Sequence, residues 1–427
     1  MMNPAIPGPH NIIIDELSNG LRVWVYENFE SQTISLQGYV PGGSINESPQ
    51  QTGLANLTAL MLRRGAGGRS YDMLNEIIEA VGASFDFDTG RHTLGFDTYS
   101  LAEDFDLPLS LLAQSLKTPD FPETELEKSR KQLLARLEER KHSTNMQALL
   151  AFRQHLYAPG HPYRSSFLGE EATLQQFTRK QLITFYHNNI TPAGGIVVVV
   201  GALPATEIMA RLEQALGDWR HPHARPDDTI PPTPRLTGKI EVSLPIPGKS
   251  QSTLLLGWPS IPVNHPDYFS LLLCNSILGQ FGLGGRLGQR VRETLGLAYS
   301  INSSFTVNRG AGTIRISAGV NPANIGRALE AIFHELGRIR NHLVTPQELE
   351  DVQRHASGSL PLRLETNNGI GSSLINMAWY NSELDYLLTY AEKIWAVTRE
   401  DVLRVARKYF DLENYVLVTA GPPPEEA

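Results

Sequence analysis

The spacing of apolar and polar residues predicts a chain in which strands and helices alternate. On both sides of Asn19-Gly20, a dipeptide that favours a tight turn, apolar residues alternate with polar ones, so we predict a hairpin over residues 11–26. The same alternation predicts strands over 33–40 and around Thr89-Gly90, and the aliphatic run 196–200 predicts a fully buried strand.

Helical spacing of apolar residues occurs between these strands. Ser70 is suited to cap one helix and Gly82 to end it. We predict helices over 53–63, 71–81, 107–116, 123–140 and 177–186. The mixture of hairpins and paired helices favours an α+β fold, a mostly antiparallel sheet covered by helices on one side, over a doubly wound parallel sheet.

A proline-rich stretch divides the chain. Residues 221–234, HPHARPDDTIPPTP, contain five prolines and almost no apolar residues, which is typical of a linker. We therefore place a linker over 219–237, between an N-terminal unit, 1–218, and a C-terminal unit, 238–427.

The C-terminal unit repeats features of the N-terminal unit. Short matches recur in the same order at a period of about 220 residues. They are Ser31-Gln32 with Gly38 and Ser250-Gln251 with Gly257, the tripeptides ELE at 125–127 and 348–350, Thr178-Arg179 and Thr398-Arg399, and the strand-ending Gly201 and Gly421. Thr178 with Gln181 and Thr345 with Glu348 also fit capping boxes. We therefore predict two homologous α/β units.

The composition indicates an ordinary folded protein. The 427 residues exceed what one core supports, and the net charge of -8 argues weakly against a nucleic-acid partner. A single cysteine, Cys274, excludes an intrachain disulfide, and its apolar neighbours indicate a buried thiol. No leader and no apolar run of bilayer length is visible, so we expect a cytoplasmic protein without a membrane partner. A secreted or periplasmic chain trimmed of its leader would look the same.

The stretch 284–300, GGRLGQRVRETLGLAYS, carries the candidate chemistry. Apolar residues repeat at helical spacing up to Leu295, and Gly296 predicts the end of that helix. Arg292 then lies near the helix end and Tyr299 on the strand that follows, so both side chains can point to one place. A guanidinium and a phenol together polarise a carbonyl oxygen or stabilise an oxyanion. The spacing alone leaves open a simpler interpretation, two surface residues.

Several motifs resemble one known family. They are LSNGLRVWVY at 17–26, GGSINE at 42–47, GLANLTALM at 53–61, the helix end at 78–82, residues 181–201 and RETLGLAYS at 292–300. The chain resembles the insulinase, or pitrilysin, family of zinc peptidases, in the short two-unit form that includes mitochondrial processing peptidase. The resemblance implies two homologous α+β halves, and two such subunits that face each other around a chamber.

The resemblance also implies where a zinc site would lie. The family carries an inverted motif, His-x-x-Glu-His, on the helix at 53–61, and here its three positions are Asn56, Ala59 and Leu60. Alanine and leucine have no donor atom and asparagine is a poor zinc ligand. The third ligand of the family would fall near Arg136, which is a cation. We therefore expect this chain to bind no cofactor, and zinc to lie in a partner subunit.

Other functional positions of the family are present. Arg292 and Tyr299 match the arginine–tyrosine pair that, in the resembling enzymes, holds the scissile carbonyl over the zinc of the opposite unit. Gly282, Gly284 and Gly285 fall where some members have a glycine-rich loop implicated in substrate handling, although glycines here also suit the turn before a helix.

The preferred prediction is the non-zinc subunit of a heterodimeric zinc metallopeptidase, inactive alone. It would supply Arg292, Tyr299 and part of a chamber wall for peptide-bond hydrolysis at the partner's zinc. The alternative is a catalytically inactive structural or peptide-binding homologue, as in the core subunits of respiratory complexes. A homodimer that acts by another mechanism has less support, because no nucleophile–base constellation stands out in the sequence.

Overall fold

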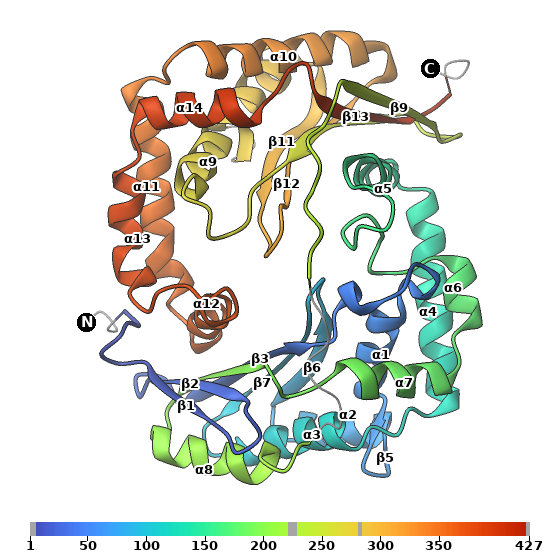
Figure 1. Ribbon diagram of the computed structural model, residues 1–427, viewed down its shortest axis with the longest axis vertical. Helices are drawn as coiled ribbons and strands as arrows, with labels where there is room; N and C mark the ends of the chain where they lie inside the picture. The colour runs from blue at the N-terminus through green and yellow to red at the C-terminus, as the bar shows by residue number, and fades with distance from the viewer. Residues whose placement is uncertain (1–5, 221–228, 281–283, 424–427) are drawn as a thin grey trace. The chain divides into compact units, whose positions relative to one another are not determined.

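The computed structural model describes residues 6–220, 229–280 and 284–423 (Figure 1). The chain forms two compact units, each built around one sheet. The first comprises Met1–Leu137, Ser166–Thr229 and Leu360–Thr389, and the second Glu138–Ser165, Ile230–Ser359 and Tyr390–Ala427. No described helix is long and apolar enough to cross a membrane.

The first unit contains a six-stranded sheet in the order β1-β2-β8-β3-β7-β6. Its strands are β1 (Ile13–Glu16), β2 (Arg22–Glu27), β3 (Thr33–Pro41), β6 (Ser84–Thr89), β7 (Thr93–Leu101) and β8 (Ile196–Gly201). A small hairpin, β4 (Gly65–Ala66) and β5 (Arg69–Ser70), lies outside it. β2 pairs parallel with β8, and the other described pairs are antiparallel. Every residue of β8 is buried, as its aliphatic sequence predicts.

The second unit contains a five-stranded sheet in the order β11-β12-β10-β13-β9. Its strands are β9 (Lys239–Pro245), β10 (Ser252–Pro259), β11 (Ala298–Thr306), β12 (Thr313–Val320) and β13 (Tyr415–Gly421). β9 pairs parallel with β13 and the other described pairs are antiparallel, so this order repeats β6-β7-β3-β8-β2 of the first sheet strand for strand. The predicted α+β fold with two related sheet-containing halves is confirmed.

The helices complete both units. They are α1 (Leu54–Leu62), α2 (Tyr71–Glu79), α3 (Asp106–Lys117), α4 (Glu123–Lys141), α5 (Thr144–Leu156), α6 (Glu171–Gln176), α7 (Arg179–Asn189), α8 (Ala205–Leu216), α9 (Tyr268–Asn275), α10 (Ile325–Asn341), α11 (Pro346–Arg363), α12 (Asn367–Trp379), α13 (Tyr386–Trp395) and α14 (Arg399–Tyr409). Tight 3₁₀ turns are η1 (Ser44–Asn46), η2 (Pro49–Gln51) and η6 (Pro322–Asn324), and wide π-type turns are η3 (Ser276–Gln280) and η5 (Gly288–Thr294).

Local capping chemistry fixes where several helices begin. The Ser70 hydroxyl accepts a hydrogen bond from Met73 N, as the sequence predicts. Thr178 and Thr398 form capping boxes at α7 and α14, two helices of equal length at equivalent places in the repeat. Thr345 and Glu348 bond reciprocally at α11, with Glu348 N to Thr345 Oγ1 at 3.1 Å. Each such cap contributes about 1 kcal/mol.

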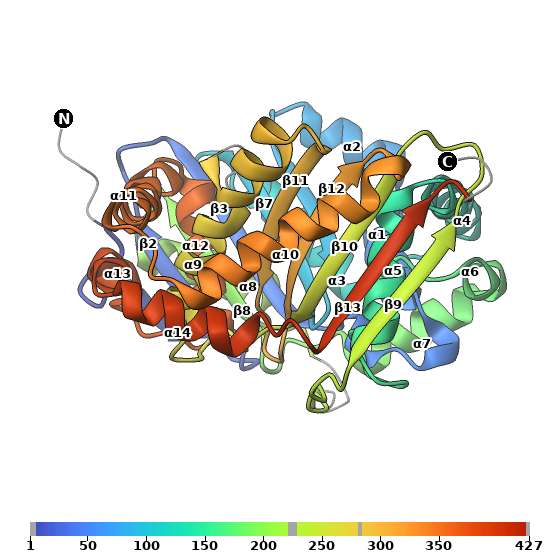
Figure 2. The ribbon, with the colours of Figure 1, turned by 90° about the horizontal axis from the view of Figure 1, so that it is seen from above.

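Each sheet also packs against one helix from the other half of the sequence. In the second unit α9, α10 and α14 lie over one face of the sheet (Figure 2), and α5 packs on the other face against β10 and β13. There Phe152 of α5 is buried with Leu255, Val416 and Val418. Burial of such side chains stabilises the unit by about 1.5–3 kcal/mol each.

The first unit receives α12 in the same way, and this helix packs on β3 and β8. Asn367 is buried and its Nδ2 donates to the Thr33 carbonyl at 2.8 Å, while Gln37 Nε2 donates to Asn368 Oδ1 at 2.6 Å. The compact units therefore differ from the contiguous units 1–218 and 238–427, because long-range packing of α5 and α12 outweighs position in the chain. Part of the proposed linker, residues 221–228, lies outside the described residues.

Candidate functional site

Arg292 and Tyr299 lie on the two sides of a helix-to-strand turn in the second unit. The wide helix η5 buries Val291 and ends at Gly296, whose φ is 61°. Gly296 N donates to the Arg292 carbonyl at 3.1 Å and Leu297 N to the Val291 carbonyl at 2.9 Å, which satisfies two carbonyls that the helix end would otherwise leave unpaired. The predicted helix, its glycine stop and the following strand are thus all present, although the helix is π-wound.

A β-bulge directs Tyr299 outward. In the register of β11 on β12, Ala298 pairs with Val320 and Ser300 with Gly319, so Tyr299 is an extra residue between them. Bulges of this kind re-aim a side chain and recur beside functional sites. The Tyr299 side chain is 76% exposed, which is unusual for a large aromatic residue on a strand.

Arg292 is also available to an external group. Its side chain is 43% exposed, and its Nε lies 3.9 Å from Glu293 Oε1, a distance at which an exposed ion pair contributes little. Tyr299 has no hydrogen-bond partner among the described residues. A guanidinium and a phenol therefore stand exposed within one short turn, and both are suited to donate hydrogen bonds to a developing oxyanion.

A buried ion pair fixes the start of this turn. Arg286, 8% exposed, donates from Nε to Glu348 Oε1 at 2.6 Å and from Nη2 to Oε2 at 3.0 Å. Although burial alone would raise it, the pKa of Glu348 is lowered to about 2 by hydrogen bonds from Arg286 and Thr345. The same carboxylate completes the capping box of α11, so η5 is tied to a second helix.

The three glycines of the predicted loop are not equivalent. Gly285 is buried, and a Cβ on it would lie 2.6 Å from the Cα of Gly279, so glycine is required there for close backbone packing. Gly284 is exposed, and Gly282 lies outside the described residues. Substrate contact by these glycines stays a prediction.

The four degenerate zinc positions do not fit a zinc site. On α1, Ala59 is buried, while Asn56 and Leu60 are partly buried, and Arg136 on α4 is exposed. Asn56 offers the single donor among them on α1, and its buried Nδ2 has no hydrogen-bond partner in the described part of the chain. Zinc sites need three or four nitrogen, sulfur or carboxylate ligands, and these residues cannot supply that set.

Glu47 is a buried capping residue of α1, a role that the sequence patterns above do not identify. Its Oε1 accepts from Ala55 N at 2.7 Å and from Gly53 N at 3.1 Å, so it caps α1. Burial raises the pKa of Glu47 to about 8, against these two N–H groups, which favour the carboxylate. Its position at the end of the motif GGSINE, shortly before the predicted helix, is the sequence feature that could have indicated this role.

The edge of the first sheet carries an acidic face, which was not among the features predicted from the sequence. Asp86 on β6 lies directly opposite Asp97 on β7, and Asp88 follows on the same face of β6. Burial, followed by repulsion from Asp86 and Asp88, raises the pKa of Asp97 to about 6. The alternation Phe85-Asp86-Phe87-Asp88 could have indicated this face, because residues of one parity share a side of a strand.

Comparisons with known proteins match the chain to one family. The profile described as Insulinase (Peptidase family M16) matches residues 22–164, and that described as Peptidase M16 inactive domain matches residues 176–355. The chain is 24% identical over 410 residues to an uncharacterized zinc protease, YmxG, of Bacillus subtilis, an alignment that covers 95% of this chain and 97% of the relative.

Two further likenesses concern proteins described as inactive. A Helicobacter pylori relative named non-peptidase homolog YmxG is 24% identical over 368 residues, covering 84% of this chain and 82% of that protein. The crystal structure of a peptidase M16 inactive domain from Pseudomonas fluorescens matches with a TM-score of 0.89 and 26% identity, covering 97% of this chain and 98% of that one. Together with the fold, these matches confirm the resemblance seen in the sequence: the chain belongs to the insulinase family of peptidases, family M16.

Proposed function

We propose that this chain is the non-zinc subunit of a two-subunit M16 peptidase. The supporting observation is an asymmetry: α1 has no donor set for zinc, while Arg292 and Tyr299 stand exposed around the turn between η5 and β11. A homologous partner with His-x-x-Glu-His would bind the zinc, and a polypeptide would be the substrate. This chain binds no metal in the proposal.

Arg292 and Tyr299 act on the scissile carbonyl in this proposal. As the carbonyl carbon becomes tetrahedral, negative charge develops on its oxygen, and the guanidinium and phenol donate hydrogen bonds to that charge. Donors of this type stabilise the transition state more than the ground state, so the loss of one lowers kcat by roughly a hundredfold or more.

The first experiment is a pull-down of the tagged chain from its native host, with mass spectrometry and a zinc assay. A near-stoichiometric partner with His-x-x-Glu-His and about one zinc per pair supports the proposal. Fractionation of the same cells tests the expected cytoplasmic location.

Turnover by the reconstituted pair is the second test. Arg292→Ala and Tyr299→Phe should each lower kcat by roughly a hundredfold. Arg290→Ala is the matched control, because Arg290 is exposed on the same helix η5 and should leave kcat unchanged. Full turnover by both variants would refute the catalytic role.

The second candidate is a structural or peptide-binding protein with the same fold and no catalytic role. The name of the Helicobacter pylori relative, non-peptidase homolog, favours it. Recovery of a membrane complex, or of no zinc-containing partner, in the pull-down would support this alternative.

A further inference from the structure

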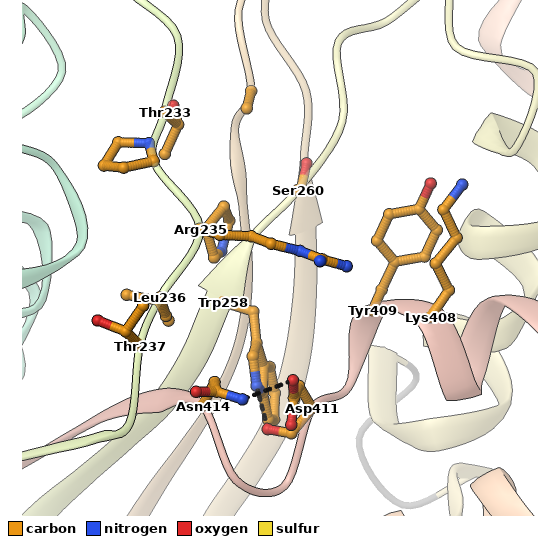
Figure 3. A pocket seen from close by; sticks show the side chains of 13 residues that line it. Thr233, Arg235, Leu236, Thr237, Trp258, Ser260, Lys408, Tyr409, Asp411 and Asn414 are labelled. Carbon is orange, nitrogen blue, oxygen red and sulfur yellow. Dashed lines mark hydrogen bonds between the residues drawn. The ribbon is translucent and has the colours of Figure 1, made fainter.

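The second unit contains a pocket that the proposed function does not use (Figure 3). It has a volume of about 580 Å³ and is bounded by the stretch before β9, the end of β10, and the end of α14 with the turn after it. This volume is within the usual range for small-molecule sites. Arg235, Leu236, Trp258, Ser260, Lys408 and Tyr409 are among the residues that line it.

One side of the pocket is apolar and firmly held. Trp258 packs edge-on against Phe410 with 5.4 Å between ring centroids, and its Nε1 donates to the Asp411 carbonyl at 2.8 Å. Leu236, Pro259 and Ala311 extend the apolar lining. This wall is suited to an apolar group, and its rigidity means that little side-chain freedom is lost on binding.

Arg235 brings an unpaired positive charge to this pocket. Figure 3 shows its guanidinium reaching across the pocket toward Tyr409 and Lys408, and it has no hydrogen-bond or ion-pair partner among the described residues. Its neighbours fix its backbone: Leu236 packs against the core of the unit, and Gly238 N donates to Asn414 Oδ1 at 2.6 Å. The backbone of Arg235 is therefore held beside the pocket.

The polar side chains opposite Arg235 are bound to a buried carboxylate. Lys408 Nζ and Tyr409 Oη both donate to Asp267 Oδ2, at 2.8 and 2.6 Å, and Arg404 Nη1 donates to Oδ1 at 2.5 Å. Asp267 is only 7% exposed, so its single charge is used within this network.

The other charged groups that line the pocket already have partners. Lys408 is paired with Asp267, and Asp411 accepts hydrogen bonds from Asn414 Nδ2 and Glu413 N at 2.9 Å each. Arg404, behind this wall, is also paired with Asp401, at 3.2 Å. Among the described residues that line the pocket, Arg235 is therefore the charged side chain without a partner.

We infer that this pocket binds a carboxylate that carries an apolar group. The planar fork of Arg235 matches a carboxylate with two parallel hydrogen bonds, and its single unpaired charge matches a monoanion. The wall around Trp258 receives the apolar group. The free C-terminus of a peptide and a small organic acid share this chemistry.

Calorimetric titration of the full chain tests the inference with defined probes. N-acetyl-L-leucine should bind, N-acetyl-L-leucinamide should bind about tenfold or more weakly, and inorganic phosphate should not compete. A hexapeptide ending in leucine distinguishes a peptide C-terminus from a small organic acid as the ligand. If the hexapeptide binds more tightly than N-acetyl-L-leucine, the ligand is a peptide C-terminus; if the two bind equally, it is a small acid.

Variants assign the binding to Arg235. Arg235→Ala should raise the Kd for N-acetyl-L-leucine about tenfold or more, and Arg235→Lys by less, because a charge remains but the fork does not. Arg327→Ala, at an exposed arginine of the same unit, is the control and should leave Kd unchanged. Equal binding of acid and amide, no effect of Arg235→Ala, or no binding at all would each overturn the inference. No partner subunit is needed, so these outcomes are independent of the proposed peptidase role.

Discussion

The turn from α2 into β6 and the turn from η5 into β11 occupy equivalent places in the two sheets. Each helix ends near a glycine in the left-handed region, Gly82 with φ 65° and Gly296 with φ 61°, and the strand that follows is an edge strand. Yet the residue three positions after the glycine is Phe85, 1% exposed, in the first unit and Tyr299, 76% exposed, in the second.

The residue four positions before each glycine is likewise buried in the first unit and exposed in the second. It is Ile78, which is buried, in the first unit, and the half-exposed Arg292 in the second. The register of β6 on β7 is regular, whereas β11 has its bulge at Tyr299. The two turns share the same backbone arrangement of helix, left-handed glycine and edge strand. The side chains of the first turn are buried in the core, whereas those of the second are exposed to solvent. A fold repeat therefore does not imply repetition of a site.

Truncation of the two equivalent aromatic residues should give the largest difference. Phe85→Ala leaves a cavity in the core and should lower the free energy of unfolding by about 3–5 kcal/mol. Tyr299→Ala removes an exposed side chain and should change it by less than about 0.5 kcal/mol. Urea denaturation of both variants measures this, and equal losses would show that Tyr299 is part of the packing.

The ion pair that fixes the start of η5 should give the next largest effect. Arg286→Met should cost about 2 kcal/mol, less than for a fully buried pair because Glu348 is 30% exposed. Since the pKa of Glu348 falls from 4.5 to about 2 on folding, the pair stabilises above pH 4.5 and is lost as pH falls toward 2. Denaturation between pH 2 and 6 measures the slope, and Glu348→Gln should flatten it; an unchanged slope would contradict this assignment.

The shared glycine geometry predicts similar costs in both units. A side chain is strained at a φ near 60°, so Gly82→Ala and Gly296→Ala should each lower the free energy of unfolding by about 1 kcal/mol. Space is not the cause, because a Cβ at either glycine meets no atom within 4 Å. Thermal unfolding measures the loss. Gly68→Ala, at φ 76° with equally open surroundings, is the control and should lower the free energy of unfolding by a similar amount. A loss at only one of Gly82 and Gly296 would show that the two turns are not equivalent.

The acidic face of the first sheet should give the smallest effect. Asp86 and Asp88 have Ser300 and Asn302 as neutral counterparts on β11, counted from the two glycines. Because folding raises the pKa of Asp97 from 3.8 to about 6, stability should fall as pH rises through this interval, opposite in sign to the effect of Glu348. Asp97→Asn should remove this slope and stabilise by about 0.2–1 kcal/mol at pH 7. If Asp97→Asn were less stable than the parent protein at pH 7, repulsion between Asp97 and the carboxylates of β6 would not be the cause.

Local sequence signals predicted those features that depend on neighbours in the chain. The hairpin at Asn19-Gly20, the cap at Ser70 and the helix stop at Gly296 follow from turn and capping chemistry, and all three are present. Buried Cys274 follows from its apolar neighbours in the same way. The order of strands in each sheet agrees with the repeat because equivalent segments fold alike.

The remaining features depend on contacts between distant residues. The bulge at Tyr299 is a shift of one residue against β12, which alternation in β11 alone does not reveal. The pocket joins Arg235, Trp258 and Tyr409, which are far apart in the sequence. Neither is encoded in a local pattern, so the polar pair is predictable from the sequence, whereas the bulge that exposes its tyrosine and the pocket are not.

The exchange of α5 and α12 has a consequence for how the chain can be divided. The two helices have equal length and equivalent places in the repeat, and each packs on the sheet formed by the other half. The arrangement resembles the exchange of an identical element between two copies in a domain-swapped dimer, here within one polypeptide. A fragment cut at the proline-rich stretch would lack a helix that packs on its sheet, so we expect each half of the sequence to need the other in order to fold.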